Sequence, residues 1–321
     1  MSGEQVLSRE SSISIKGISA VAIMLGHLGK ITGFWFLYPF WKSALLFVGV
    51  FFMLSGYGLM YNYSNSSEYL NHFLKKRIVS ILFPAYVVYI LFGCIEAIIT
   101  PGGGGQSVQS IIQYIFLKEF YKRTNWFVFE IVFLYILFWI IYKFFSLKIA
   151  SVIMSIVMVL WIIAGFYCHI DKAWYDSSLC FLVGILYARH EEKWNEWMQK
   201  SYLLKNISFL IICGGCFGVF LALGNNSFIG HPVLKNVAAC SFCMWVLSIL
   251  QKIDLKNRLF QWLGVYSYEI FLLHLIWMQL IEGYALSPWY YMFFVILLTL
   301  ISAVFVKKMI IYALHGKKKR R

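Results

Sequence analysis

One stretch decides how this chain folds: Ile15-Lys16-Gly17-Ile18-Ser19-Ala20-Val21-Ala22-Ile23-Met24-Leu25-Gly26-His27. It is mostly apolar, with a cation near its start and a histidine at its end. In a helix, residues eleven positions apart lie on one face within about 20° and are about 16 Å apart along the axis. In a bilayer whose apolar core is about 30 Å thick, His27 therefore lies near the midplane. An ionisable ring is costly at that depth, which makes His27 a candidate functional residue.

The composition around this stretch is that of a membrane protein. Of the 321 residues, 61% are hydrophobic and 13% are charged, whereas soluble domains carry about 25% charged residues. The apolar runs are continuous over about 17–25 residues, which favours helices and excludes a transmembrane β-barrel. We therefore predict an all-α, polytopic, integral membrane helical bundle.

Hydropathy divides the chain into about ten predicted transmembrane helices with no separate extramembrane domain. The chain thus forms one transmembrane domain over residues 1–321, with a basic tail over 313–321. The predicted spans are 16–34, 43–62, 78–99, 126–145, 149–168, 175–189, 206–224, 234–251, 266–286 and 289–312.

The distribution of the 28 Lys and Arg residues predicts the orientation of these helices. Seven fall in the segments opposite the termini, and the other 21 fall on the side of both termini. Cytoplasmic loops accumulate Lys and Arg, so both termini are predicted to be cytoplasmic, in a multi-pass protein of the cell membrane. The same rule accounts for the net charge of +14, so we expect membrane lipids as partners and no nucleic acid. The seven are Lys30, Lys42, Lys118, Lys122, Arg123, Lys172 and Lys235.

Three segments carry patterns with a structural explanation. The glycines at 102–105 are not followed by Gly-Lys-Ser/Thr, so they predict a flexible turn, and 113–121 predicts an interfacial helix. The run 189–205 is rich in Glu, Lys and Trp and predicts an amphipathic connector. Two Cys-x-x-Cys pairs, at 213–216 and 240–243, lie inside apolar helices without nearby cations, so we interpret them as packing cysteines and expect no metal.

Two of the seven histidines lie inside predicted spans, and they are His27 and His274. Ser267 precedes His274 by seven residues and lies on nearly the same helix face. The other histidines fall near the predicted interfaces, where surface or snorkelling positions explain them. They are His72, His169, His190, His231 and His315.

Buried carboxylates and basic clusters supply further candidates. Trp126 opens a predicted span with Glu130 one turn deeper, and Glu269 opens another, so both carboxylates need partners across the bundle. The cluster Lys75-Lys76-Arg77 precedes a span. Such a cluster either sets topology or binds a cytosolic phosphate through charge-assisted hydrogen bonds.

Four motifs in order resemble one family. They are Lys16-Gly17-Ile18 with Leu25-Gly26-His27, then Phe51-Phe52-Met53-Leu54-Ser55-Gly56-Tyr57, then Lys76-Arg77-Ile78 before Pro84, and finally Ser267-Tyr268-Glu269-Ile270-Phe271-Leu272-Leu273-His274. Together these motifs resemble the acyltransferase 3 family of membrane O-acyltransferases, which modify cell-surface glycans.

The resemblance implies a role for individual residues. It implies that His27 is the catalytic histidine supported by Lys16, and that Arg77 contributes to binding acetyl-CoA. Ser80 stands where the family has a second arginine, and Lys75 and Lys76 are candidates to replace it. We add Glu130 and His274 as candidate catalytic residues. The candidate substrate-binding residues are Ser55, Tyr57, Trp126 and Ser267.

The predicted function is transfer of an acetyl group from cytoplasmic acetyl-CoA to a hydroxyl of an extracytoplasmic or lipid-linked polysaccharide. His27 would act as general base, because neutral imidazole suits that role near pH 7. Direct transfer and an acyl-histidine intermediate both fit. A transporter or flippase of a lipid-linked glycan is the alternative, because it also needs aromatic spans and polar groups at the midplane.

Overall fold

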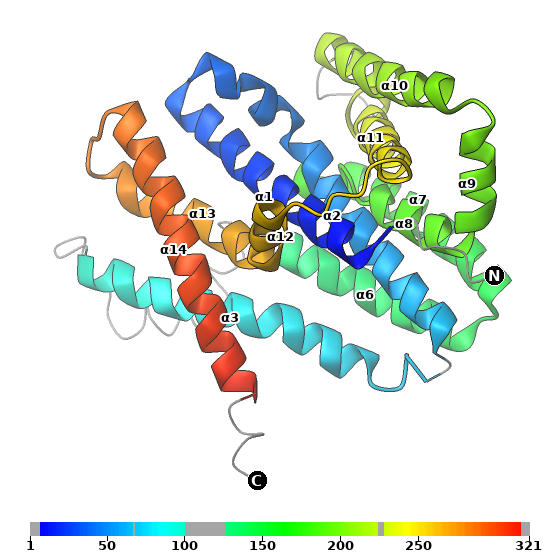
Figure 1. The fold of residues 1–321 in the computed structure, drawn as a ribbon, viewed down its shortest axis with the longest axis horizontal. Helices are drawn as coiled ribbons and strands as arrows, with labels where there is room; N and C mark the ends of the chain where they lie inside the picture. Colours follow the sequence, from blue (N-terminus) through cyan, green and yellow to red (C-terminus); the bar gives the residue numbers. More distant parts are fainter. Residues whose placement is uncertain (1–6, 67, 100–125, 224–227, 316–321) are drawn as a thin grey trace.

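The computed structural model describes residues 7–66, 68–99, 126–223 and 228–315. Within these ranges the regular structure is helical, as the composition predicts (Figure 1). Short turns are η1 (Trp35–Leu37), η2 (Lys172–Trp174) and the π-helical η3 (Ile229–Val233). The α-helices are α1 (Arg9–Thr32), α2 (Tyr38–Asn65), α3 (Phe73–Ile99), α6 (Trp126–Phe144), α7 (Leu147–Tyr167), α8 (Leu179–Arg189), α9 (Glu191–Gln199), α10 (Tyr202–Leu223), α11 (Leu234–Leu250), α12 (Arg258–Val265), α13 (Ser267–Glu282) and α14 (Pro288–His315).

Each of the ten predicted spans coincides with a helix, in the predicted order. In the described ranges, seven helical segments are long and apolar enough to cross a membrane, or eight if α12 and α13, bent by 68°, form one span. Helix α8 has only 11 residues. It is therefore about 16 Å long, too short to cross a 30 Å apolar core alone. Hydropathy detects that α8 is apolar but does not give its length.

Some predicted segments lie outside the described residues. They are the glycine turn at 102–105, the interfacial helix at 113–121 and most of the basic tail. The predicted amphipathic connector contains α9, which joins α8 to α10 along one side of the bundle (Figure 1).

Glycines allow α1 to pack closely at the centre of the bundle (Figure 1). A Cβ at Gly26 would lie 2.7 Å from the carbonyl oxygen of Phe40 in α2. A Cβ at Gly17 would lie 2.5 Å from the backbone nitrogen of Gly264 in α12. Only glycine permits backbones to approach this closely. The motif glycines beside Lys16 and His27 therefore fix the neighbours of both residues.

The start of α1 is tied to the loop between α11 and α12. Ser11 Oγ donates to Asp254 Oδ1 at 2.9 Å, and Ser14 Oγ donates to the Leu255 carbonyl at 2.6 Å. A hydrogen bond from Lys256, followed by the bond from Ser11, lowers the pKa of the Asp254 carboxyl. These contacts join segments more than 240 residues apart and fix the start of α1 against the loop between α11 and α12.

Candidate active site

Two histidines from distant segments meet inside the bundle. The ring centroids of His27 in α1 and His274 in α13 are 5.3 Å apart, with the ring planes inclined by 43°. The Nδ1 atom of His274 lies 3.0 Å from the carbonyl oxygen of Ile270. A carbonyl only accepts hydrogen bonds, so this Nδ1 carries the hydrogen and Nε2 presents a lone pair. Nε2 is buried and accepts no hydrogen bond from the described part of the chain. A buried acceptor is thus held beside His27.

His27 lines a cavity of about 340 Å³. Its wall comes from α1, α2, α6, α13 and the segment around η2. Among the described residues of this wall, the charged or ring-nitrogen groups are His27, Trp126 and Asp176, and the other lining residues are apolar. They are Ile23, Ala44, Leu45, Val48, Ala173, Phe271 and Leu275. The cavity is a mostly apolar chamber with three polar side chains, an arrangement typical of small-ligand sites.

The two buried carboxylates, Glu269 and Glu130, differ in whether a partner contacts them. Glu269 is 1% exposed and forms an ion pair with Lys307, whose Nζ lies 3.0 Å from Oε1. The prediction of a partner across the bundle is confirmed for Glu269. Glu130 is 0% exposed, and neither of its carboxyl oxygens has a hydrogen-bond partner in the described ranges. An unsatisfied buried carboxyl is costly, so Glu130 is a candidate for a role in chemistry.

Arg77, the predicted acetyl-CoA residue, lies near the Lys16 end of the α1 face that also carries His27. Arg77 lies within electrostatic range of Lys16, and its Nη2 donates to Tyr69 Oη at 2.8 Å. Ser55 forms a hydrogen bond with Tyr135 in α6, and Arg77 acts electrostatically on the same tyrosine. The two cations Lys16 and Arg77 and three hydroxyl groups thus form a cationic cluster. The hydroxyl groups are those of Ser55, Tyr69 and Tyr135. Lys75 and Lys76 are exposed at the surface just before this cluster.

Two candidate substrate-binding residues lie away from the cavity wall. Tyr57 is buried and donates from Oη to Glu191 in α9 at 3.3 Å. Ser267 is buried and donates from Oγ to the Gly264 carbonyl at 2.9 Å, at the bend between α12 and α13. Of the four candidates, Trp126 lies in the cavity wall and Ser55 lies in the cationic cluster.

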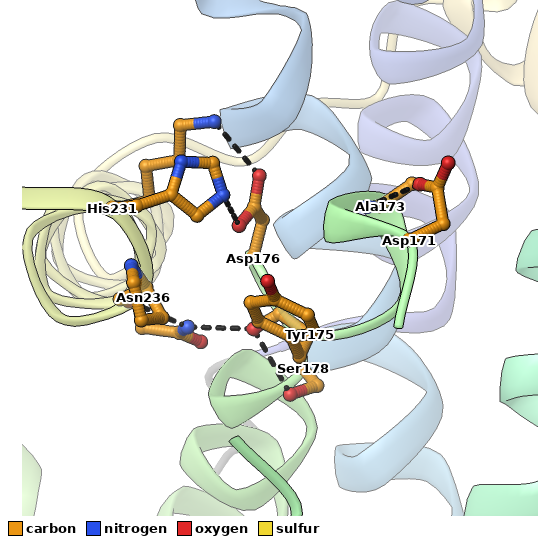
Figure 2. Close-up of polar contacts among 9 residues, drawn as sticks. Asp171, Ala173, Tyr175, Asp176, Ser178, His231 and Asn236 are labelled. Atoms are coloured by element: carbon orange, nitrogen blue, oxygen red, sulfur yellow. Dashed lines mark hydrogen bonds and ion pairs between the residues drawn. The ribbon is translucent and has the colours of Figure 1, made fainter. Parts of the chain in front are cut away.

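One side chain of the cavity, Asp176, was missed from the sequence, and its neighbour His231 was explained wrongly. Asp176 lines the cavity and contacts His231, which is 0% exposed (Figure 2). The surface or snorkelling position that was to explain His231 is therefore wrong: the ring is buried in the protein, and a carboxylate partner offsets the cost of burying it. Spacing carried a signal, since His231 and Lys235 are four residues apart and share a helix face that an acidic residue could meet.

In the part of the chain that is described, the cysteines and the other residues able to bind metals do not form a metal site. The Cys180 and Cys240 sulfurs are 4.0 Å apart, and both residues are free thiols. Across the described ranges no group of three or more His, Cys, Asp or Glu residues could hold a metal ion.

The motifs around this site run from α1 to α13. The match to a known family covers the same part of the chain and extends into α14. The model of the acyltransferase 3 family, described as an acyltransferase domain, matches residues 11–308. The chain belongs to this family. No curated protein and no solved structure matches the chain. The match spans every residue of the histidine pair, the cavity and the cationic cluster, so the site lies within the acyltransferase domain.

Proposed function

We propose that this acyltransferase moves an acetyl group from cytoplasmic acetyl-CoA to a hydroxyl of an extracytoplasmic or lipid-linked polysaccharide. One observation carries the proposal: His27 lines the cavity on one side and lies beside the buried acceptor nitrogen of His274. In this proposal the Lys16 end of α1 faces the cytoplasm, as the Lys and Arg distribution predicts. The donor then enters from the cationic cluster and the acceptor enters through the cavity.

The proposed reaction needs one base and one oriented partner. An unprotonated ring nitrogen of His27 takes the proton of the acceptor hydroxyl, and the hydroxyl oxygen attacks the thioester carbonyl carbon. The carbon–sulfur bond breaks, and the thiolate of coenzyme A leaves and takes up a proton from the imidazolium. His274 Nε2 can accept a hydrogen bond from the other His27 nitrogen, which stabilises the imidazolium while it exists.

The test of the overall proposal compares surface glycans from strains with and without the gene by mass spectrometry. Loss of O-acetyl groups with an unchanged amount of glycan supports the acetyltransferase. A reduced amount of glycan with normal acetylation instead indicates the transporter, and it would overturn the proposal.

The donor site gives a prediction about affinity. Arg77→Glu is expected to weaken acetyl-CoA binding about tenfold or more, because a carboxylate beside Lys16 replaces a cation that can pair with phosphates. Isothermal titration of the purified protein in nanodiscs measures the change. Lys148→Glu is the matched control, since Lys148 is an exposed cation on the same predicted side. Equal affinity of wild type and Arg77→Glu would reject this donor site.

Glu130 gives a prediction in which stability and activity move in opposite directions. Glu130→Leu is expected to stabilise the bundle by about 1–3 kcal/mol, because it removes a buried polar group with no partner. Acetyl transfer is expected to fall at least about tenfold if this carboxyl serves as the candidate catalytic acid or base. Thermal unfolding and a radiolabelled acetyl-CoA assay measure the two effects.

Glu269→Leu is the matched control for Glu130→Leu. It leaves Lys307 without its carboxylate partner, so it is expected to destabilise the bundle. A Glu130→Leu protein that melts below wild type, or that keeps full transfer activity, contradicts the prediction.

A further inference from the structure

We propose that the Asp176 carboxylate, held in place by His231 and Lys235, binds the hydroxyl groups of an uncharged sugar residue in the cavity that His27 lines. This inference rests on the proposed function for its assignment of the cavity to the acceptor. It adds the group that recognises the acceptor and the chemical class of that acceptor.

Two basic side chains fix the carboxylate. The Nε2 atom of His231 lies 2.7 Å from Oδ1 of Asp176, and Nζ of Lys235 lies 2.8 Å from Oδ2. Figure 2 shows the His231 ring facing Asp176, and Lys235 follows His231 by four residues, about one helical turn. A carboxylate offers about four lone-pair positions, so these two contacts leave positions for a further donor. The ion pairs thus orient Asp176 without using up its capacity to accept hydrogen bonds.

The two basic groups do not face the cavity. Neither His231 nor Lys235 is among the lining residues, whereas Asp176 is. The ammonium group of Lys235 lies 4.7 Å from the centre of the Phe220 ring in α10, which places it against another helix. Among the described residues, a molecule in the cavity therefore meets Asp176 at this wall and neither of its two basic partners.

Holding the loop in place does not by itself require Asp176. The side chain of Asn236 already fixes the segment before α8: Nδ2 donates to the Tyr175 carbonyl at 2.7 Å and to the Pro232 carbonyl at 2.9 Å. Its Oδ1 accepts from the Leu179 backbone nitrogen at 3.2 Å. These neutral hydrogen bonds anchor the loop to α11. The cluster of Asp176, His231 and Lys235 beside them adds a carboxylate at the cavity wall.

The shape and chemistry of the cavity select the class of ligand. A volume of about 340 Å³ is at the small end of ligand pockets, about 300–1,000 Å³, and suits one sugar residue better than a chain. Trp126 and Phe271 offer apolar faces for the C–H groups of a pyranose, and Asp176 accepts hydrogen bonds from its hydroxyls. A phosphate or uronate would meet the lone pairs of Asp176, with Glu130 within electrostatic range of Asp176. The wall therefore favours an uncharged, hydroxyl-bearing ring.

The test measures binding of simple glycosides to the full-length protein in nanodiscs, without any donor. The neutral probes are the methyl β-glycosides of glucose, galactose and N-acetylglucosamine, and the anionic probes are the methyl glycosides of glucuronic and galacturonic acid. Saturation-transfer NMR gives each affinity. We expect wild type to bind at least one neutral probe about tenfold or more tightly than either uronide.

The variants separate recognition from structure. Asp176→Asn is expected to lose about tenfold in affinity for the neutral probe and most of its discrimination against uronides, because the repelling charge is gone. Asn236→Ala removes the neutral loop anchor and keeps the carboxylate, so it is expected to melt earlier and to keep the neutral preference. A general loss of structure would lower every affinity together and would not change this preference.

Three outcomes would overturn the inference: wild type that binds no neutral probe, wild type that binds uronides equally well, or Asp176→Asn with the wild-type preference. The proposed function fails separately. A protein that binds neutral glycosides through Asp176 but transfers no acetyl group contradicts the function alone. One that transfers acetyl while Asp176→Asn keeps the wild-type preference contradicts the inference alone.

Discussion

His27→Ala is expected to lower acetyl transfer by about 10²–10⁴-fold while the bundle stays folded. The loss is large because a sugar hydroxyl is a poor nucleophile until a base takes its proton. The fold is expected to survive because the His27 ring lines a cavity, so its removal enlarges an existing space. Transfer from radiolabelled acetyl-CoA and the thermal unfolding midpoint are measured on the same purified protein.

His72→Ala is the matched control for His27→Ala. His72 is an exposed histidine before α3 and has no place in the cavity wall. It is expected to keep full activity and stability. His27→Gln keeps most of the side-chain volume and still lacks a base, so it is expected to be as inactive as His27→Ala. Wild-type transfer by either His27 variant would reject His27 as the base.

Gly184→Ala is expected to destabilise the bundle by about 1–3 kcal/mol or to prevent folding. A Cβ at Gly184 in α8 would lie 1.9 Å from the backbone oxygen of Met53 in α2. The reciprocal contact has the same form, since a Cβ at Gly56 would lie 2.0 Å from the backbone oxygen of Phe181. Backbone atoms cannot rotate away as a side chain can, so α2 and α8 must separate. Thermal unfolding of the purified protein measures the loss.

Gly58→Ala is the matched control in α2. A Cβ at Gly58 meets nothing within 4 Å, and the residue lies inside α2. Alanine is about 0.5–1 kcal/mol better than glycine in a helix interior, so Gly58→Ala is expected to match or exceed the wild-type midpoint. If Gly184→Ala and Gly58→Ala unfold at the same temperature, the close contact at Gly184 does not hold α2 and α8 together.

The two glycine predictions show where sequence reasoning has a limit. Gly56 ends the second motif with Tyr57, Gly58 follows directly, and both lie in the same predicted span, 43–62. The period does not tell which of them faces another backbone. The structure places Gly56 against α8 and leaves Gly58 open. The same limit applies to Tyr57, whose hydroxyl lies against Glu191 rather than at the cavity.

The sequence by itself determined what depends on composition and on the local period of a helix. Composition determined that the chain is a helical membrane protein, and a spacing of eleven residues put Lys16 and His27 on one face. Ordered motifs indicated the family that the match over residues 11–308 then showed.

Only the tertiary structure decided which faces meet. It brought His274 to His27 across 247 positions and His231 to Asp176 across 55, and it left Glu130 without a hydrogen-bond partner among the described residues. The physical reason is that helix periodicity is a local property, whereas the choice of neighbour depends on close backbone approach at particular glycines and on loops that fix depth and rotation. The spacing of His231 and Lys235 within one segment indicates a shared face, but it does not name Asp176 as the residue that meets it.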